Sequence, residues 1–584
     1  MPAAAVSSQA CDGSGIFLVS ALVLPLVGIL LTFLAGGKYA RGITLVLLVA
    51  GLGVAAGIAE GIWPTGQALT YLPGGWLPPL GIKLRADGLS AVMIAVTAFV
   101  IFAVGLYAPP EFRIARGKTE TRKSFSFWIL LLAIWLAMNA IFLGNDLFNL
   151  YVALELLTFA AVPLVSLSGA AGTLKAALRY LLFVLIGSVL YLLGTALLYG
   201  AYGTLDVGLL SQRVHTEPAT LVAAALMTVG LLAKTALFPL YLWLPPAHAG
   251  APSTASAVLS ALVVKGSFFI VVRLWFGVMP GVVTLPSAQL LASLGAAAIL
   301  FGSVLALRQE RLKLLIAYST LAQIGYLFLM FPLAFDARSA QLQTGSALTG
   351  GLLQTISHAT AKASMFMAAG LIYAALGHDR IAALRGIARV MPISVLAFAL
   401  GGVALMGLPP SGAYVAKKLL LDAAAKTGEW WWDLVIQAGG FFTTSYVLLV
   451  LAHALWPADG HVKLRAPVSR LQETAALVLA LCSMLLGLAA LGPVPLGSLS
   501  LAPKELLSAI VLVLGGGVLA WGFGHGLPRV AVGDVVIAIM SPVRIVAVAV
   551  AAVTERADNV LRRWPAAGLS LLVLVVMFVW AMLS

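Results

Sequence analysis

The sequence predicts an all-α polytopic membrane protein with about 16 transmembrane helices. Of its 584 residues, 61% are hydrophobic and 10% are charged, whereas soluble domains carry about 25% charged residues. Apolar runs of about 20 residues, the length that crosses a bilayer, follow one another along the chain. Most basic residues fall in the short loops between these runs. This composition excludes a water-soluble enzyme, a disordered chain and a collagen-like protein.

The predicted spans are the apolar runs of bilayer length. They lie near 16–36, 42–61, 87–109, 125–144, 147–168, 176–200, 219–240, 254–273, 284–307, 314–334, 347–376, 392–422, 432–456, 472–496, 505–526 and 566–584. Loops on one side of this arrangement carry 18 Lys and Arg residues, and the opposite loops carry 7. By the positive-inside rule, we expect the N-terminus outside and the protein in the cell inner (plasma) membrane. No basic residue precedes the first apolar run, which favours a span over a cleaved signal peptide.

The net charge of +14 is explained by the basic loops and does not indicate a nucleic-acid partner. The two cysteines, Cys11 and Cys482, form neither a CxxC pair nor a disulfide framework, and the phosphate-binding pattern GxxxxGK[ST] is absent. We therefore expect no cofactor and no metal site. Residues 533–563 mix charged with apolar residues, which predicts an amphipathic helix along the cytoplasmic face; a seventeenth span over 533–553 is the alternative.

Charged side chains within the predicted spans are the strongest functional signal, because a charge near the bilayer centre costs about 2.5–3.5 kcal/mol on insertion scales. The deep groups are one acid, Glu155, and the bases Lys234, Lys265, His358, Lys362 and Lys417. A single deep lysine is as readily explained by snorkelling or by a structural ion pair. One acid, however, cannot neutralise lysines on four helices. A row of such groups can exchange protons, and we therefore predict a proton relay.

Prolines predict breaks in two of the helices that carry deep lysines. The prolines concerned are Pro239, Pro245, Pro409 and Pro410. Proline removes a backbone donor and clashes with the preceding turn. A membrane tolerates the resulting break only where protein or a wet cavity surrounds it. Two such breaks, each near a deep lysine, suggest two structural repeats with ion sites at the breaks.

His248 lies in WLPPAHAGAPS, which we predict to be a short loop at the cytoplasmic end of the seventh span. The residue is a candidate proton-uptake group. Ordinary loop polarity explains it equally well.

Several long motifs resemble a known family, the antiporter-like proton-translocating subunits. This family is shared by respiratory complex I, the Mrp-type multisubunit cation/proton antiporters and membrane-bound hydrogenases. The motifs are GNDLFNLYVALELL (144–157), KTALFPLYLWLPPAHAGAPSTASAVLSALVVKG (234–266), RLKLLIAYSTLAQIGY (311–326), ISHATAKASMFMAAG (356–370) and GLPPSGAYVAKKLLL (407–421). The lysine in span eight and the GLPPSG motif look most like the D-type subunit of Mrp antiporters and the B-type subunit of hydrogenase-4.

The resemblance implies a fold with two inverted five-helix repeats, spans 4–8 and 9–13, and with discontinuous spans 7 and 12. The corresponding division of the chain is 1–124, 125–275 and 276–457, followed by C-terminal helices over 458–584. The resemblance also implies that Glu155 pairs with Lys234 and that the path continues to the deep residues of spans 8, 11 and 12. Lys418 beside Lys417 is a secondary candidate, and the sequence leaves open which of the two faces the path.

We therefore expect a proton-translocating membrane subunit of a multisubunit ion pump or antiporter. Its expected partners are other membrane subunits, and its expected ions are protons, with or without sodium. The chain is not expected to be catalytic alone, although it would form part of a translocase within an NADH:quinone oxidoreductase-like or hydrogenase complex. Two alternatives stay open: a D-type subunit of an Mrp-type sodium/proton antiporter, and a membrane energy-coupling anchor for a soluble partner enzyme.

Overall fold

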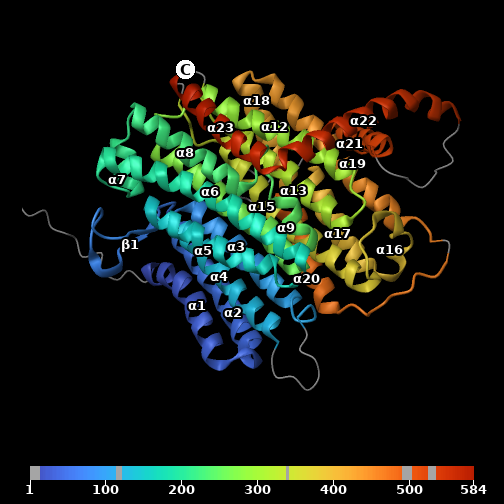
Figure 1. Cartoon of the computed structure of the whole chain (residues 1–584), viewed down its shortest axis with the longest axis horizontal. Helices are drawn as coiled ribbons and strands as arrows, with labels where there is room; N and C mark the ends of the chain where they lie inside the picture. Colours follow the sequence, from blue (N-terminus) through green and yellow to red (C-terminus); the bar gives the residue numbers. More distant parts are fainter. Residues whose placement is uncertain (1–13, 113–120, 337–340, 459, 489–502, 524–533) are drawn as a thin grey trace, which may run out of the picture.

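A computed structural model describes residues 14–112, 121–336, 341–458, 460–488, 503–523 and 534–584. Figure 1 shows long helices packed side by side into one bundle, with the N-terminal helices at one edge. The first half of the chain contains α1 (Ser14–Ala35), α2 (Gly37–Ile62), α3 (Gly88–Tyr107), α4 (Arg122–Leu143), α5 (Leu147–Val165), α6 (Ala171–Tyr202), α7 (Val207–Arg213), α8 (Pro218–Thr235), α9 (Leu244–Gly250), α10 (Ser253–Val258) and α11 (Val264–Arg273). The π-helical turns η2 (Leu259–Val263) and η3 (Leu274–Val278) follow α10 and α11.

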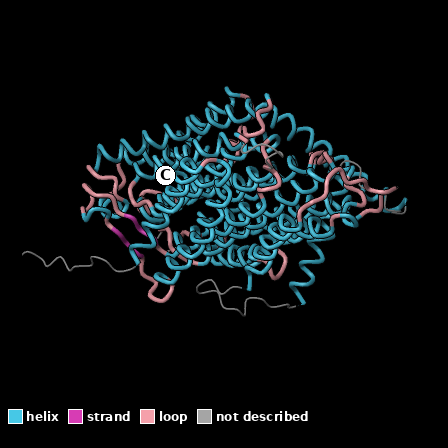
Figure 2. The backbone as a smooth tube through the Cα atoms, turned by 90° about the horizontal axis from the view of Figure 1, so that it is seen from below, coloured by secondary structure: helices cyan, strands magenta, loops and turns pink. Residues whose placement is uncertain are grey.

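The second half of the chain is also helical. It contains α12 (Leu285–Leu307), α13 (Leu312–Phe328), α14 (Met330–Leu333), α15 (Ser346–Leu376), α16 (Ile387–Val390), α17 (Pro392–Met406), α18 (Gly412–Thr427), α19 (Trp430–Leu455), α20 (Arg470–Leu485), α21 (Pro503–Phe523), α22 (Asp534–Leu561) and α23 (Trp564–Leu583). Three short 3₁₀ turns also occur, η1 (Pro73–Gly75), η4 (Ile381–Ala383) and η5 (Leu486–Leu488). Strands β1 (Leu69–Tyr71) and β2 (Leu84–Ala86) form a small antiparallel ribbon at one edge of the bundle (Figure 2), which was not predicted from the sequence.

Within the described residues, 14 helical segments are long and apolar enough to cross a membrane. They confirm the predicted all-α membrane architecture. The predicted spans at 392–422 and 505–526 correspond to shorter apolar helices, Pro392–Met406 and Leu507–Phe523. Residues 489–496 and 524–526 of two predicted spans, residue 533 and Cys11 lie outside the described residues.

The seventh predicted span is broken where its prolines begin. Helix α8 ends at Thr235, and Ala236 adopts a left-handed conformation with φ 60°, which ends the helix. The indole of Trp243 donates to the Ala233 carbonyl at 3.0 Å, so one carbonyl that the helix leaves without a backbone partner is satisfied inside the protein. Prolines at the first positions of α9 then start a new helix.

The twelfth predicted span is broken in the same manner. Helix α17 ends at Met406, and Gly407 is left-handed with φ 75°. Helix α18 begins after Ser411, whose hydroxyl accepts from the Tyr414 backbone N–H at 3.1 Å. Both breaks therefore have local causes in glycine, proline and capping residues.

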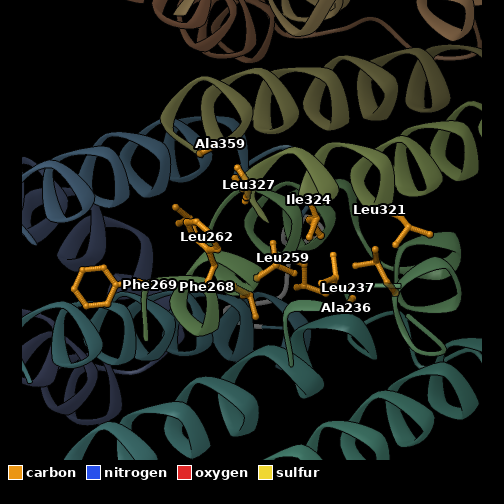
Figure 3. Packing of buried hydrophobic residues seen from close by; sticks show 14 of the residues in the cluster. Ala236, Leu237, Leu259, Leu262, Phe268, Phe269, Leu321, Ile324, Leu327 and Ala359 are labelled. Carbon is orange, nitrogen blue, oxygen red and sulfur yellow. The ribbon is translucent and has the colours of Figure 1, made fainter. Parts of the chain in front are cut away.

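Buried apolar side chains from distant parts of the chain surround the first break. Figure 3 shows Leu237 from the break in one buried cluster with Leu259 of η2 and with Leu321 and Ile324 of α13. The break is thus enclosed by protein, as the cost of unpaired backbone groups in lipid requires.

The helix α22 connects α21 to α23 and extends from the bundle at one side of Figure 1. Its C-terminal half is bound to the bundle, because Glu555 accepts from Arg308 at 2.7 Å and Asp558 accepts from the hydroxyls of Tyr241 at 2.8 Å and Tyr318 at 3.1 Å. Tyr241 belongs to the first break and Tyr318 to α13, so α22 ties the two halves of the chain together. The alternatives for 533–553, a surface helix or a further span, stay predictions.

Candidate functional site

The acid Glu155 and the base Lys234 lie in contact between α5 and α8. The Nζ atom of Lys234 donates to Glu155 Oε1 at 3.0 Å, and the side chains are 5% exposed for Lys234 and 12% exposed for Glu155. Lys234 also donates to the Thr158 hydroxyl at 3.0 Å, and the Ser188 hydroxyl of α6 donates to the same Glu155 oxygen. Charge on Lys234 is thus held by a carboxylate that itself has a second donor, which makes the pair sensitive to small displacements of three helices.

A second group of deep residues consists of Lys265, His358 and Lys362. All three side chains are fully buried. The ammonium of Lys265 donates to the Ser260 carbonyl within the π-helical turn η2, and Lys362 donates to the Ser319 hydroxyl of α13 at 2.6 Å. Lys265 and Lys362 are close enough for their charges to act on each other and on His358. The fold therefore brings spans 8 and 11 together at one charged cluster.

His248 belongs to this buried region, and the prediction that it lies in a loop is wrong. It lies in α9, is fully buried, and its ring stacks on Phe366 of α15 with 4.8 Å between ring centroids. The charges of Lys265, Lys313 and Lys362 act on the ring. The loop prediction failed because the proline pair starts a helix that turns the chain back into protein instead of only ending the previous helix.

Lys313 is one of the 18 Lys and Arg residues that the sequence places in the loops of one side, and for this residue the prediction is also wrong. Its side chain is 7% exposed in the first turn of α13, and its Nζ donates to the Ala251 carbonyl at 2.7 Å. Beside it, the Glu111 carboxylate accepts from the backbone N–H groups of Ser253 at 2.8 Å and Thr254 at 3.2 Å. Lys313 and Glu111 thus fix the backbone between α9 and α10, directly after His248.

The side chains of Lys417 and Lys418 have different neighbours. Lys417 lines a small cavity of about 20 Å³, together with Tyr326, Gln354, Met406, Gly407 and Gly440. A Cβ atom at position 440 would lie 3.1 Å from Lys417 Nζ, so the glycine leaves room for the ammonium group. Lys418 instead pairs with Glu505 of α21, with 3.4 Å between Nζ and Oε1. Of the two lysines, Lys417 is therefore the one that lines the cavity.

Two pairs of hydroxyl groups join neighbouring helices beside the deep lysines, and none of these hydroxyls was among the residues predicted from the sequence. The Thr235 hydroxyl, next to Lys234, donates to Ser267 of α11 at 2.9 Å. The Ser260 and Thr320 hydroxyls are 2.9 Å apart and join η2 to α13. The signal was available, because Thr235 follows Lys234 directly and Ser260 precedes Lys265 by five residues.

The structure thus places the predicted residues in three groups: the pair Glu155–Lys234, the cluster around Lys265 and Lys362, and the cavity of Lys417. Other acids are buried outside these groups, and each has a partner of its own. Among the described residues they are Asp206 with Asn145 at 2.8 Å, Asp379 with Arg311 at 2.9 Å, Glu429 with Gln289 at 2.6 Å, Glu473 with Ser394 at 2.8 Å, and Asp558 with Tyr241 at 2.8 Å.

Comparison with characterised proteins identifies relatives of similar length. NADH-quinone oxidoreductase subunit N of Desulforudis audaxviator is 34% identical over 418 residues, which cover 70% of this chain and 80% of the relative. The D-type subunit of the Na(+)/H(+) antiporter of Bacillus subtilis is 28% identical over 66% of this chain and 75% of its own. The F(420)H(2) dehydrogenase subunit N of Methanosarcina mazei is 29% identical over 57% of this chain and 69% of its own.

Solved structures share the fold. A chain of the Mrp complex from a Dietzia species superposes with a TM-score of 0.72 and 22% identity over 87% of this chain and 97% of its own. A chain of an archaeal membrane-bound sulfane sulfur reductase superposes with a TM-score of 0.72 and 25% identity, over 86% of this chain and 96% of its own. A chain of respiratory complex I from Thermus thermophilus superposes with a TM-score of 0.63 and 25% identity, over 81% of this chain and 97% of its own.

A family described as "NADH:quinone oxidoreductase/Mrp antiporter, TM" matches residues 144–443. The matched range includes the six deep residues Glu155, Lys234, Lys265, His358, Lys362 and Lys417. The match covers more than half of the chain, and the subunit N relative agrees with it. The chain therefore belongs to the NADH:quinone oxidoreductase/Mrp antiporter transmembrane family.

Proposed function

We propose that the chain is a proton-translocating membrane subunit of a multisubunit ion pump or antiporter. The observation that carries the proposal is the buried cluster of Lys265, His358 and Lys362, flanked by the pair Glu155–Lys234 on one side and by the Lys417 cavity on the other. Several bases buried without an equal number of acids are costly for a structural role alone. Groups that gain and lose protons in turn avoid holding all these charges at once.

Glu155 acts as the switch of this relay. While its carboxylate contacts Lys234, the ammonium form of that lysine is stabilised. When the pair opens, Lys234 can pass its proton toward Lys265, and the changed charge biases the occupancy of the next site. The route is supported by the hydroxyl links of Thr235 with Ser267 and of Ser260 with Thr320, which join the segments that carry Lys234 and Lys265 to their neighbours.

The proposed context is a complex in the cell inner (plasma) membrane, with other membrane subunits as partners and the N-terminus outside. The concentration of basic residues in alternate loops supports this orientation. We further propose that 125–275 and 276–457 are the two inverted repeats, because each ends with a proline-broken helix and the helix that follows it.

The test uses the intact complex in inverted membrane vesicles, with proton uptake followed by quenching of a pH-sensitive dye. Glu155→Ala and Lys234→Ala abolish proton uptake while the complex still assembles on native gels. Wild-type uptake in both variants would refute the relay. Energising the vesicles in parallel with NADH and with a sodium pulse distinguishes a redox-driven pump from a sodium/proton antiporter, which the likeness to the Bacillus antiporter favours as second candidate.

A further inference from the structure

Two stripes of buried polar residues, one on α15 and one on α13, lead from the charged cluster toward the Lys417 cavity. On α15, Gln354, His358 and Lys362 follow at intervals of four residues and therefore share one face, with about 6 Å between successive positions. On α13, Ser319 and Gln323 have the same spacing. Both stripes are fully or almost fully buried.

Two hydrogen bonds join the stripes and leave a position between them. Lys362 Nζ donates to Ser319 Oγ at 2.6 Å, and further along the same face Gln354 Nε2 donates to Gln323 Oε1 at 3.0 Å. His358 lies between these two bonds on α15. Both nitrogens of its ring are buried and have no hydrogen-bond partner among the described residues. Buried polar atoms of this kind are usually satisfied by ordered water, and the flanking amides and hydroxyl offer such water its partners.

The orientation of Gln323 is set by a third helix. Its Nε2 donates to the Thr443 hydroxyl at 3.0 Å and to the Tyr446 hydroxyl at 3.2 Å, both on α19. The carbonyl oxygen of Gln323 is thereby directed to Gln354, and it accepts from Nε2 of that residue. Gln354 also lines the cavity that Lys417 lines. Gln354 therefore contacts the stripe on one side and the cavity on the other.

We infer that Gln354, oriented by Gln323, is a positioning residue that aligns water between His358 and Lys417, which completes the relay across the second break. The inference rests on the proposed function. An amide neither gains nor loses a proton near neutral pH, so the proton moves from Lys362 or His358 to water and from water to Lys417. Throughout, Gln354 keeps its own protons and fixes the direction of the hydrogen bonds.

The test replaces each amide by a thioether of similar size in the full complex. Gln354→Met and Gln323→Met lower proton uptake about tenfold or more, because transfer depends steeply on alignment, while assembly on native gels stays unchanged. Gln354→His restores uptake, since imidazole both donates and accepts. Thr355→Val is the matched control, because the Thr355 hydroxyl bonds only to the Gly351 carbonyl of its own helix, at 2.8 Å, among the described residues.

Each outcome is decisive. Wild-type uptake in both methionine variants overturns the inference, and if Lys417→Ala is inactive in the same assay the proposed function stands. Wild-type uptake in Lys417→Ala contradicts the proposed function itself. Loss in Gln354→Met without recovery in Gln354→His assigns Gln354 a purely structural role and also overturns the inference. If Gln354→Met does not assemble, Gln323→Met on the other helix decides.

Discussion

The contact between Glu155 and Lys234 provides the sharpest quantitative test of the relay. Glu155→Gln removes the negative charge and keeps the shape of the side chain. The amide oxygen can still accept from Lys234 and from Ser188. The substitution therefore isolates the charge of the switch from its hydrogen bonds, and assembly of the complex is expected to survive.

The magnitude follows from the geometry of the pair. At an effective dielectric constant of about 20, unit charges 3.0 Å apart attract by roughly 5.5 kcal/mol. Desolvation offsets part of this, and loss of one partner of a buried pair costs about 3–5 kcal/mol. The lower value alone changes the ratio of the ammonium form to the neutral form of Lys234 about a hundredfold, since about 1.4 kcal/mol is a factor of ten. We expect proton uptake to fall by about that factor.

The assay is proton uptake per assembled complex in inverted vesicles. Asp206→Asn is the matched control, because Asp206 is another buried acid of the first half whose oxygen accepts from Asn145 at 2.8 Å. Uptake by this control, normalised to assembled complex, is expected to match the wild type. Uptake by Glu155→Gln within a factor of two of the wild type would show that the charge of Glu155 does not gate the relay.

Two further predictions concern Lys417 and Asp87. Lys417→Ala abolishes proton uptake, whereas Lys418→Ala changes it less than about twofold. The reason is that the partly exposed ion pair of Lys418 with Glu505 contributes less than about 1 kcal/mol of interaction free energy. Dye quenching in vesicles compares the uptake of the two variants. Burial alone raises the pKa of Asp87, but hydrogen bonds and charge from Arg273 outweigh this and hold that pKa below its usual 3.8. The pair therefore stabilises the fold above about pH 4 and loses this contribution as the pH falls through the lowered pKa. Asp87→Asn should thus lower the melting temperature of the detergent-solubilised complex at pH 7, and the difference from the wild type should shrink as the pH falls through the lowered pKa of Asp87.

The parts of the fold that depend on local sequence were predictable. Apolar runs of bilayer length predicted the helices, since lipid requires helices of that length. The prolines predicted both breaks, because proline removes a backbone donor and its ring clashes with the preceding turn. The ribbon of β1 and β2 was not predictable in this way, because Leu69–Tyr71 and Leu84–Ala86 are too short to show alternation.

The parts of the site that depend on packing were predicted less well. His248 and Lys313 have loop-like neighbours in sequence, and only the approach of α15 and of residue 251 buries them. Gln354 was not predicted as a site residue, because only charged residues within the spans were considered and its side chain is a neutral amide. Its spacing of four residues before His358 extends the face already recognised, and a search for any buried polar group at that spacing would have included it.

The three central lysines differ in the oxygen that each ammonium contacts, and this difference orders their roles. Lys234 contacts a carboxylate, which favours the charged form and so retains the proton. Lys265 contacts a backbone carbonyl, which accepts but never donates. Lys362 contacts the Ser319 hydroxyl, which accepts from the ammonium and, by turning from the Ile316 carbonyl, can donate to the neutral amine. Lys362 can therefore change charge with the least rearrangement, which suits it to pass protons on, whereas Lys234 is suited to hold one until Glu155 moves.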